Sequence, residues 1–351
     1  MDFANIKEWK IPYNGSLVDV ISVKDNNNTR VIWEKPNPGP DYSEPFWIEN
    51  TLSSPKNVTV TAENSSRIFA SFYYSTNKSD WTYINRTSSS NLSFTFSIPA
   101  NTKYYIKTNA NGRLSYGDNS EWPSAVTDII GDSSGHFNIG GNIMSLLFGS
   151  SFTEERTLTY QCAAAALFCD WTSLYDASKL LLPATTLSDK CYTQMFFGCT
   201  NLVNPPETLP AMTLSKFCYD YMFANCSSLI TTPPLPATTL ANYCYRSMFN
   251  GCSSLTTAPD LLFEYQLNQQ GIPSAPLGVY DWMFGGCTSL NYVKCLYSVE
   301  SFTPTGQSTQ YVYFNTWLGM VANNGTFVKK AGINWWRGDS GIPSDWTIIE
   351  Q

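Results

Sequence analysis

The sequence LPATTLSDKCYTQMFFGCTNL (Leu182–Leu202) returns twice, in altered form, further along the chain. Its Met-Phe pair at Met195 reappears 27 residues later at Met222 and a further 26 residues later at Met248. The Cys-Tyr pair before it, the second cysteine and the late leucine return in the same order. A fixed period in the twenties indicates a solenoid built from stacked repeats.

Each repeat is predicted to contain a turn segment and an extended segment. Phe196, Cys199 and Leu202 are three residues apart, which predicts one face of a short helical or 3₁₀ turn. The LPATTL segment is apolar and β-branched, and we expect it to be extended, with hydrogen bonds to the next repeat. Because one repeat cannot bury its own apolar face, the Met, Phe, Cys and Leu positions are predicted to form a core between stacked repeats.

The repeated residues resemble the BspA-type leucine-rich repeats of gut Bacteroidetes and of their tailed phages, the crAss-like phages among them. The similarity covers Leu167–Leu290 well and extends more weakly to Gly141–Leu146 and Asn323–Thr347. The resemblance implies surface display and adhesion rather than catalysis. The expected fold is mainly β, with an N-terminal β module and a β-sandwich followed by a capped leucine-rich-repeat (BspA-like) solenoid.

Residues 1–35 are predicted to form an N-terminal β module. Two apolar runs, Leu17–Val23 and Arg30–Glu34, flank a polar turn and predict short strands. The segment resembles the leader of Bacteroidetes phage structural proteins, which implies docking to a virion or to copies of the chain. A hairpin packed on the next domain is the alternative. Residues 36–45 open with Pro-Asn-Pro-Gly-Pro and are predicted to be a linker.

Residues 46–138 are predicted to form a β-sandwich-like domain. Polar turns at intervals of about ten residues separate five strand candidates: Val58–Ala62, Arg67–Tyr74, Trp81–Ile84, Ser93–Ile98 and Lys103–Lys107. Phe94, Phe96 and Ile98 alternate with polar residues, which indicates one buried face. The aromatic residues within Tyr73–Tyr83 are expected to be core residues or cross-strand pairs, and stacking on a sugar is the alternative.

Residues 139–310 are predicted to form the solenoid, with Gly140–Phe148 as the cap over its open end. The unit after the three regular repeats is longer, because an insertion falls at Phe263–Pro276. Such an insertion maps to a loop on one face, and contact with a partner and a neutral surface loop both remain open. Residues 311–351 are predicted to be a C-terminal cap whose aromatic residues cover the last repeat. A sugar platform is the alternative for its Trp335-Trp336 pair.

Composition and charge argue against several classes of protein. Charged residues make up only 14% of the chain and aromatic residues 15%, which favours β structure and solenoids over helical bundles. The formal charge of −7 argues against a nucleic-acid partner, which binds a basic stripe. No run approaches the length of a membrane span, so membrane insertion is not expected. The N-terminal residues do not resemble a signal peptide, which favours assembly in the host cytoplasm over export.

Seven of the ten cysteines follow the repeats. Two per repeat lie at equivalent positions, and a later one continues the second series: Cys191, Cys199, Cys218, Cys226, Cys244, Cys252 and Cys287. This spacing predicts small buried side chains that stack between repeats, which suits a reducing compartment. Disulfides between stacked turns are an alternative. Zinc is a weaker hypothesis, because the chain has no CxxC pair and only one histidine, His136.

No motif for catalysis, for a cofactor or for a metal stands out in the sequence. A serine–histidine–aspartate site would need His136, and no nucleophile motif accompanies it. Two carboxylates can hydrolyse a glycan, but neighbours in sequence such as Glu154-Glu155 do not indicate a catalytic pair. The sequence therefore predicts a protein that is not an enzyme.

The predicted function is that of a structural virion protein of a tailed phage, a head or tail fibre or decoration exposed on the particle, that displays the solenoid for adhesion to a host surface or glycan. Expected partners are other virion proteins, bound through residues 1–35, a host glycan or protein, and further copies in a homo-oligomer. A bacterial cell-surface leucine-rich-repeat adhesin is the alternative. Six residues between core positions are predicted to be exposed on the binding face: Thr193, Gln194, Asp220, Tyr221, Arg246 and Ser247.

Overall fold

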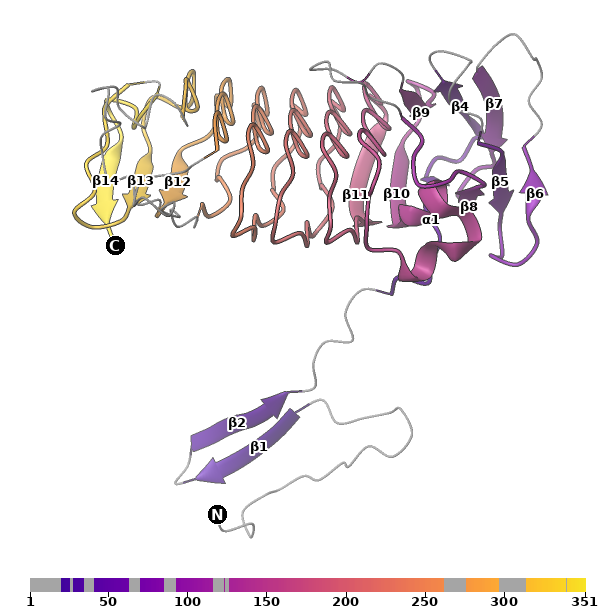
Figure 1. Ribbon diagram of the computed structural model, residues 1–351, viewed down its shortest axis with the longest axis horizontal. Coiled ribbons are helices and arrows are strands. Elements are labelled where there is room, and N and C mark those ends of the chain that lie inside the picture. Colours follow the sequence, from indigo (N-terminus) through magenta and orange to yellow (C-terminus); the bar gives the residue numbers. More distant parts are fainter. Residues whose placement is uncertain are drawn as a thin grey trace. The chain divides into compact units, whose positions relative to one another are not determined.

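The computed structural model describes residues 20–25, 28–34, 41–62, 70–84, 93–115, 123, 126–261, 276–296, 314–338 and 340–351. These residues have a mainly β fold (Figure 1). The chain divides into two compact units, Met1–Asp41 and Tyr42–Gln351, and the predicted linker at 36–45 straddles this division. In the first unit, strands β1 (Val20–Asp25) and β2 (Asn28–Glu34) pair antiparallel, which confirms the two predicted short strands.

The second unit begins with two β-sheets that share one core. A six-stranded sheet has the order β11-β10-β3-β8-β5-β6, and a three-stranded sheet has the order β7-β4-β9. The strands are β3 (Trp47–Asn50), β4 (Lys56–Ala62), β5 (Phe72–Ser75), β6 (Thr82–Tyr83), β7 (Ser93–Ile98), β8 (Thr102–Thr108), β9 (Thr127–Gly131), β10 (Phe137–Asn142) and β11 (Leu174–Leu181). Phe72 of the larger sheet meets Phe94 of the smaller one, with ring centroids 5.3 Å apart. Each of the five predicted strands overlaps an observed strand, and the predicted residues Arg67–Phe69 lie outside the described part of the chain.

Side chains alternate along these strands between the shared core and the outer faces. In β7, Phe94 and Ile98 are buried, but Phe96 is only half-buried, so the predicted buried face is right for two of its three residues. The predicted cross-strand pairing of aromatic residues is confirmed for Tyr73, which lies opposite Tyr83. The two rings lie 5.6 Å apart.

Strand β10 connects the sheets to the repeats. It pairs antiparallel with β3 and parallel with β11, so the predicted border at residues 138/139 lies inside a strand. Gly140 suits this strand because the ring of Trp47 fills the space where a Cβ would lie. Helix α1 (Met144–Phe148) and the 3₁₀ helix η2 (Gly149–Glu154) follow, where the sequence predicted a cap.

Residues 162–261 and 276–290 form a series of stacked turns, which we call the repeat stack (Figure 1). The backbone N–H groups of Tyr192, Gln194 and Phe196 donate to carbonyl oxygens in the next repeat, at 2.9–3.1 Å. The N–H groups between them donate to the carbonyl oxygen three residues back in the same repeat. The predicted helical turn is therefore right only in part: Cys199 bonds back to Phe196, but every second N–H group bonds to the neighbouring repeat.

The extended segments also bond from one repeat to the next. Isolated parallel bridges join Thr157 to Thr186 and Thr213 to Thr239. The backbone N–H of Leu214 donates to the carbonyl oxygen of Thr239 at 2.8 Å. The prediction that the LPATTL segments bond to a neighbouring repeat is confirmed at these positions.

The core of the repeat stack consists of columns of like residues. The rings of Phe196, Phe223 and Phe249 are fully buried and nearly parallel, with centroids 5.2 and 5.7 Å apart. Burial of one such ring contributes about 2–3 kcal/mol. A second aromatic column contains Tyr192, Tyr219, Tyr245 and Tyr280. The predicted Met, Phe and Cys positions and the late Leu positions are buried, which confirms them as core, whereas Leu235 and Leu240 are only half-buried.

The C-terminal segment continues both aromatic columns. Phe314 stacks on Tyr280 at 5.1 Å. Trp317 lies 6.3 Å from Phe284, which itself follows Phe249 in the phenylalanine column. Trp335 packs on Trp317 at 5.7 Å. The prediction that aromatic residues of this segment cover the last repeat is confirmed for Phe314 and Trp317, whereas Trp336 is 54% exposed.

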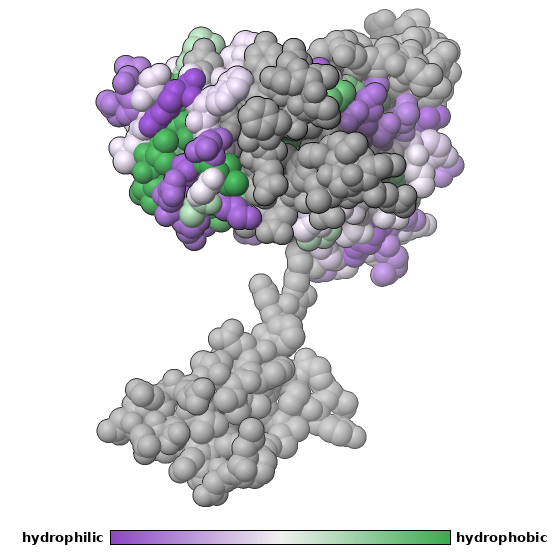
Figure 2. Space-filling model, turned by 60° about the vertical axis from the view of Figure 1, so that its left-hand side comes forward, coloured by the Kyte–Doolittle hydropathy of each residue, from purple (hydrophilic) through white to green (hydrophobic). Residues whose placement is uncertain are grey.

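A three-stranded parallel sheet closes this end, with β12 (Tyr292–Cys295), β13 (Thr326–Lys329) and β14 (Thr347–Glu350). This side of the molecule comes forward in Figure 2, where apolar residues in green lie together among polar residues in purple. Ile349 of β14 is 48% exposed. The predicted insertion at 263–276 lies outside the described residues, except for Pro276. Across the described ranges, no helix has both the length and the apolar character that a membrane crossing requires.

Candidate binding site on the repeat stack

The six residues predicted to form a binding face lie on successive turns of the repeat stack. Three of them are half-buried: Gln194, Tyr221 and Arg246. The prediction of exposure is wrong for the other three, whose exposed fractions are 2% for Thr193, 1% for Asp220 and 1% for Ser247. Whether these residues bind a ligand stays a prediction.

Neighbouring repeats cover the buried polar groups and satisfy them. The hydroxyl of Thr193 donates to the carbonyl oxygen of Asp220 at 3.0 Å. Arg246 donates from both Nε and Nη2 to the two carboxylate oxygens of Asp220, each at 2.9 Å. A bidentate pair of this kind fixes the position of both side chains. The pair therefore ties one repeat to the next as well as holding the guanidinium group in place.

The guanidinium group of Arg246 lies among three aromatic rings. Its carbon is 4.9 Å from the ring centroid of Phe217, 5.1 Å from that of Tyr243 and 5.6 Å from that of Tyr221. Phe217 and Tyr243 stack on each other at 4.9 Å with an angle of 8° between their planes. A planar cation is stabilised by such rings. We call Phe217, Asp220, Tyr221, Tyr243 and Arg246 the arginine cluster.

The three aromatic residues of the arginine cluster have an unusual backbone conformation. Phe217, Tyr221 and Tyr243 have φ angles of 57°, 54° and 58°. A left-handed conformation costs a non-glycine residue about 1–2 kcal/mol. Hydrogen bonds between repeats hold it, such as that from the backbone N–H of Tyr221 to the carbonyl oxygen of Arg246 at 2.9 Å. The repeated backbone therefore sets the direction of these side chains.

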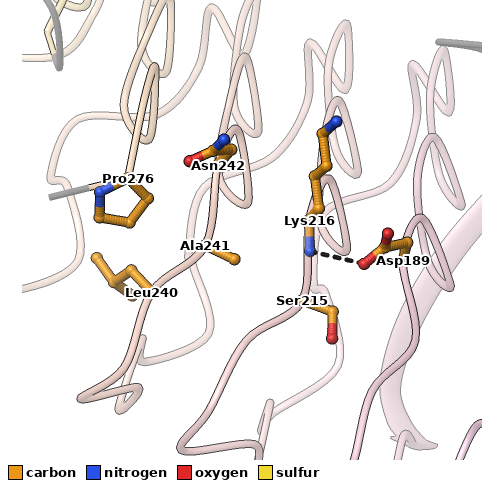
Figure 3. Close-up of a pocket in the computed structure, with 7 residues that line it drawn as sticks. All are labelled: Asp189, Ser215, Lys216, Leu240, Ala241, Asn242 and Pro276. Carbon is orange, nitrogen blue, oxygen red and sulfur yellow. Dashed lines mark hydrogen bonds between the residues drawn. The ribbon is translucent and has the colours of Figure 1, made fainter. Parts of the chain in front are cut away.

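A groove of about 550 Å³ lies beside the arginine cluster (Figure 3). Its lining comes from successive turns and consists of Asp189, Ser215, Lys216, Leu240, Ala241, Asn242 and Pro276. Asp189 accepts a hydrogen bond from the backbone N–H of Lys216 at 3.1 Å. The ammonium group of Lys216 lies 5.2 Å from the ring centroid of Phe217, which connects the groove to the cluster. The groove thus offers an ammonium group, a carboxylate and an amide beside aromatic rings.

The cysteines of the repeat stack are buried thiols. None of the ten cysteines, which all lie in the described ranges, is in a disulfide, and all but Cys169 are buried, which confirms the prediction of small buried side chains. The thiol of Cys287 lies 3.0 Å from the carbonyl oxygen of Phe249 in the preceding repeat. Burial raises the pKa of Cys244 and of Cys287 to about 12 each. In the described part of the chain, no three His, Cys, Asp or Glu side chains lie together in a way that could hold a metal ion.

The single histidine lies away from the repeat stack's groove, between the sheets and the first repeat. His136 Nδ1 and the hydroxyl of Thr51 form a hydrogen bond of 2.7 Å. The imidazole also packs on the ring of Tyr175 at 4.3 Å. These contacts explain the position of His136 in the fold. The expectation that the chain is not an enzyme stays a prediction.

The sequence analysis missed Phe217, Tyr243 and the groove residue Lys216. Phe217 and Tyr243 directly precede the first cysteine of their repeats, where Lys190 stands one repeat earlier. The available signal was a pair of positions that change between repeats directly before the constant Cys-Tyr pair.

Comparisons with protein-family models, with curated proteins and with solved structures gave no match for this chain. The candidate site is therefore supported by its own geometry.

Proposed function

We propose that the chain is a structural virion protein of a tailed phage, in which residues 139–310 form a BspA-type leucine-rich-repeat solenoid displayed for adhesion. The observation that carries the proposal is the contrast between the core and the surface of the repeat stack. The buried columns keep one residue type from turn to turn, whereas the accessible position two residues before the first cysteine changes from Asp189 to Lys216 to Asn242. Repeat proteins build binding faces in this way, with variable side chains on a constant scaffold.

The arginine cluster and the groove support adhesion to a host glycan. Aromatic rings such as Tyr243 pack against the apolar face of a sugar, while charged and amide groups bond to its hydroxyls. The groove places Lys216, Asp189 and Asn242 beside those rings. A host protein with an acidic or polar loop is the other partner that such a surface suits.

Assembly inside the host cell fits the state of the cysteines. Free thiols persist in a reducing cytoplasm, where a phage particle is built. We further propose that the unit with the β1–β2 hairpin docks to other virion proteins, and that copies of the chain form a symmetric homo-oligomer. A bacterial cell-surface adhesin is the alternative that uses the same repeats.

The test is quantitative mass spectrometry of purified phage particles and, in parallel, of the envelope fraction of uninfected host cells. The proposal predicts this chain in the particles at a fixed ratio to the major capsid protein, which serves as the internal standard. Detection in the envelope of uninfected cells, with none in particles, would overturn the virion proposal and favour the adhesin. Immunogold labelling of the repeats on intact particles then tests whether they face outward.

A further inference from the structure

The outer face of the six-stranded sheet carries a row of aromatic and basic side chains. Tyr83 of β6, Tyr73 of β5 and Lys107 of β8 are direct neighbours across three strands. The alternate residues Phe72 and Ile106 are buried on the core side, so the row lies on the outer side. Tyr83 is 45% exposed, and Tyr73 and Lys107 are half-buried. The row is therefore accessible.

The loop between β5 and β6 adds a third ring to this row. The ammonium nitrogen of Lys107 lies 4.2 Å from the ring centroid of Trp81. The indole N–H of Trp81 donates to the carbonyl oxygen of Lys78 at 3.1 Å, which fixes the ring over the sheet. Tyr73 and Tyr83 lie 5.6 Å apart with their planes tilted by 57°. Lys107 is thus bordered by aromatic rings on one side.

Lys107 differs from Lys78, in the loop between β5 and β6, in forming no ion pair with the described residues. Lys78 pairs with Glu44 at 3.0 Å, and its charge is compensated. Within the part of the chain that the structure describes, the partners of the Lys107 ammonium group are the Trp81 ring and the hydroxyl of Ser150, at 3.2 Å. Partial burial lowers the pKa of Lys107, as expected for a cation that has lost water without gaining an anion. An anion bound here would supply the missing charge.

The outer face of the smaller sheet provides a contrast. There, hydroxyl groups pair across the strands, as in the contact of 2.9 Å between Thr59 and Thr95. The lysine on that sheet, Lys56, donates to the hydroxyl of Ser134 at 3.0 Å, much as Lys107 donates to Ser150. The rings around Lys107 are thus a feature of one face and not a general property of this sandwich.

We propose that Tyr73, Trp81, Tyr83 and Lys107 form a binding site for an acidic saccharide, a pyranose that carries a carboxylate. The apolar face of the sugar ring packs on the exposed tyrosine rings, and its carboxylate pairs with the ammonium group. This chemistry favours a uronic-acid residue over a bare inorganic anion, because an anion alone makes no use of the rings. The inference rests on the proposed adhesive function and names its ligand class, but the site lies outside the repeat stack.

The test uses the full-length chain and isothermal titration calorimetry with two probes, trigalacturonate and its neutral counterpart galactotriose. Lys107→Gln is expected to weaken trigalacturonate binding about tenfold, as for loss of a charge-assisted hydrogen bond, and to leave galactotriose binding unchanged. Tyr83→Ala is expected to weaken both probes. Lys56→Gln is the matched control, since it removes the same charge and a similar contact with a serine from the other sheet, and it is expected to leave both affinities unchanged.

Absence of trigalacturonate binding by the parent chain would overturn the inference. Equal weakening of trigalacturonate binding by Lys107→Gln and Lys56→Gln would also overturn the inference. It would show that the probe responds to the net charge of the protein and not to a site at Lys107. Near-ultraviolet circular dichroism of each variant verifies that the fold is intact. The virion proposal is judged separately by the presence of the chain in particles, so either idea can fail while the other stands.

Discussion

The thiol of Cys287 illustrates how single residues hold the repeats together. Its proton points toward the carbonyl oxygen of Phe249, 3.0 Å away in the preceding repeat, in a site closed to water. Only the protonated thiol can donate this bond. Burial accordingly raises its pKa from 9.0 to about 12.

This shift predicts a pH dependence of stability. Because the folded pKa lies above the unfolded one, the contribution of Cys287 is complete below about pH 9 and is lost as pH rises toward 12. Between these values, the free energy of unfolding of the parent chain should fall more steeply than that of Cys287→Ala, by about 1.4 kcal/mol per pH unit. Urea denaturation of both proteins from pH 8 to pH 11 measures this difference. Parallel pH profiles for the two proteins would contradict the role given to the protonated Cys287 thiol.

At the scale of elements, ion pairs between neighbouring turns are expected to contribute differently to the free energy of unfolding, according to how deeply they are buried. The pair of Asp220 with Arg246 has side chains that are 1% and 16% exposed. The pair of Lys179 with Glu207, at the same distance of 2.9 Å, has side chains that are 69% and 64% exposed. Removing one partner of a buried pair leaves a charge without water or counterion, whereas an exposed charge is simply hydrated.

Asp220→Ala is therefore expected to lower the free energy of unfolding by about 3 kcal/mol, the lower end of the range for broken buried pairs, because Arg246 keeps some contact with water. Glu207→Ala is the matched control and should change it by less than about 0.5 kcal/mol. Chemical denaturation measures both. If both variants lost the same free energy of unfolding, the burial of the pair of Asp220 with Arg246 would have no effect on stability.

At the scale of the whole molecule, the chain consists of two compact units, and the second contains a continuous core of its own. That core begins with Phe46 in the first sheet and continues to Trp346 near the C-terminus. A unit that buries its own apolar surface is expected to fold alone.

A fragment of residues 42–351 is thus predicted to unfold cooperatively, with a free energy of unfolding within about 1 kcal/mol of that of the full chain. Thermal and urea denaturation, followed by near-ultraviolet circular dichroism of the packed aromatic columns, make the comparison. A fragment that lost its near-ultraviolet signal would show that the first unit is needed for the fold of the second.

The sequence by itself determined the features that depend on local pattern. The spacing of Met195, Met222 and Met248 showed the repeat, and the recurring apolar residues showed most of the core, although the burial of polar residues such as Asp220 was not predicted. Alternation in Ser93–Ile98 predicted a strand at the observed position. These predictions succeeded because a side chain's choice between core and solvent follows from its own chemistry and from the period of the backbone.

Only the tertiary structure decided how the repeats contact one another. Three kinds of contact join residues one repeat apart. They are the backbone hydrogen bonds between turns, the ion pair of Asp220 with Arg246, and the stacking of Phe217 on Tyr243. The contacts of Lys107 with the Trp81 ring and the Ser150 hydroxyl likewise depend on which segments are neighbours in space. Such contacts depend on the exact stagger between turns or strands, which the packing of the whole core fixes and which no local pattern encodes.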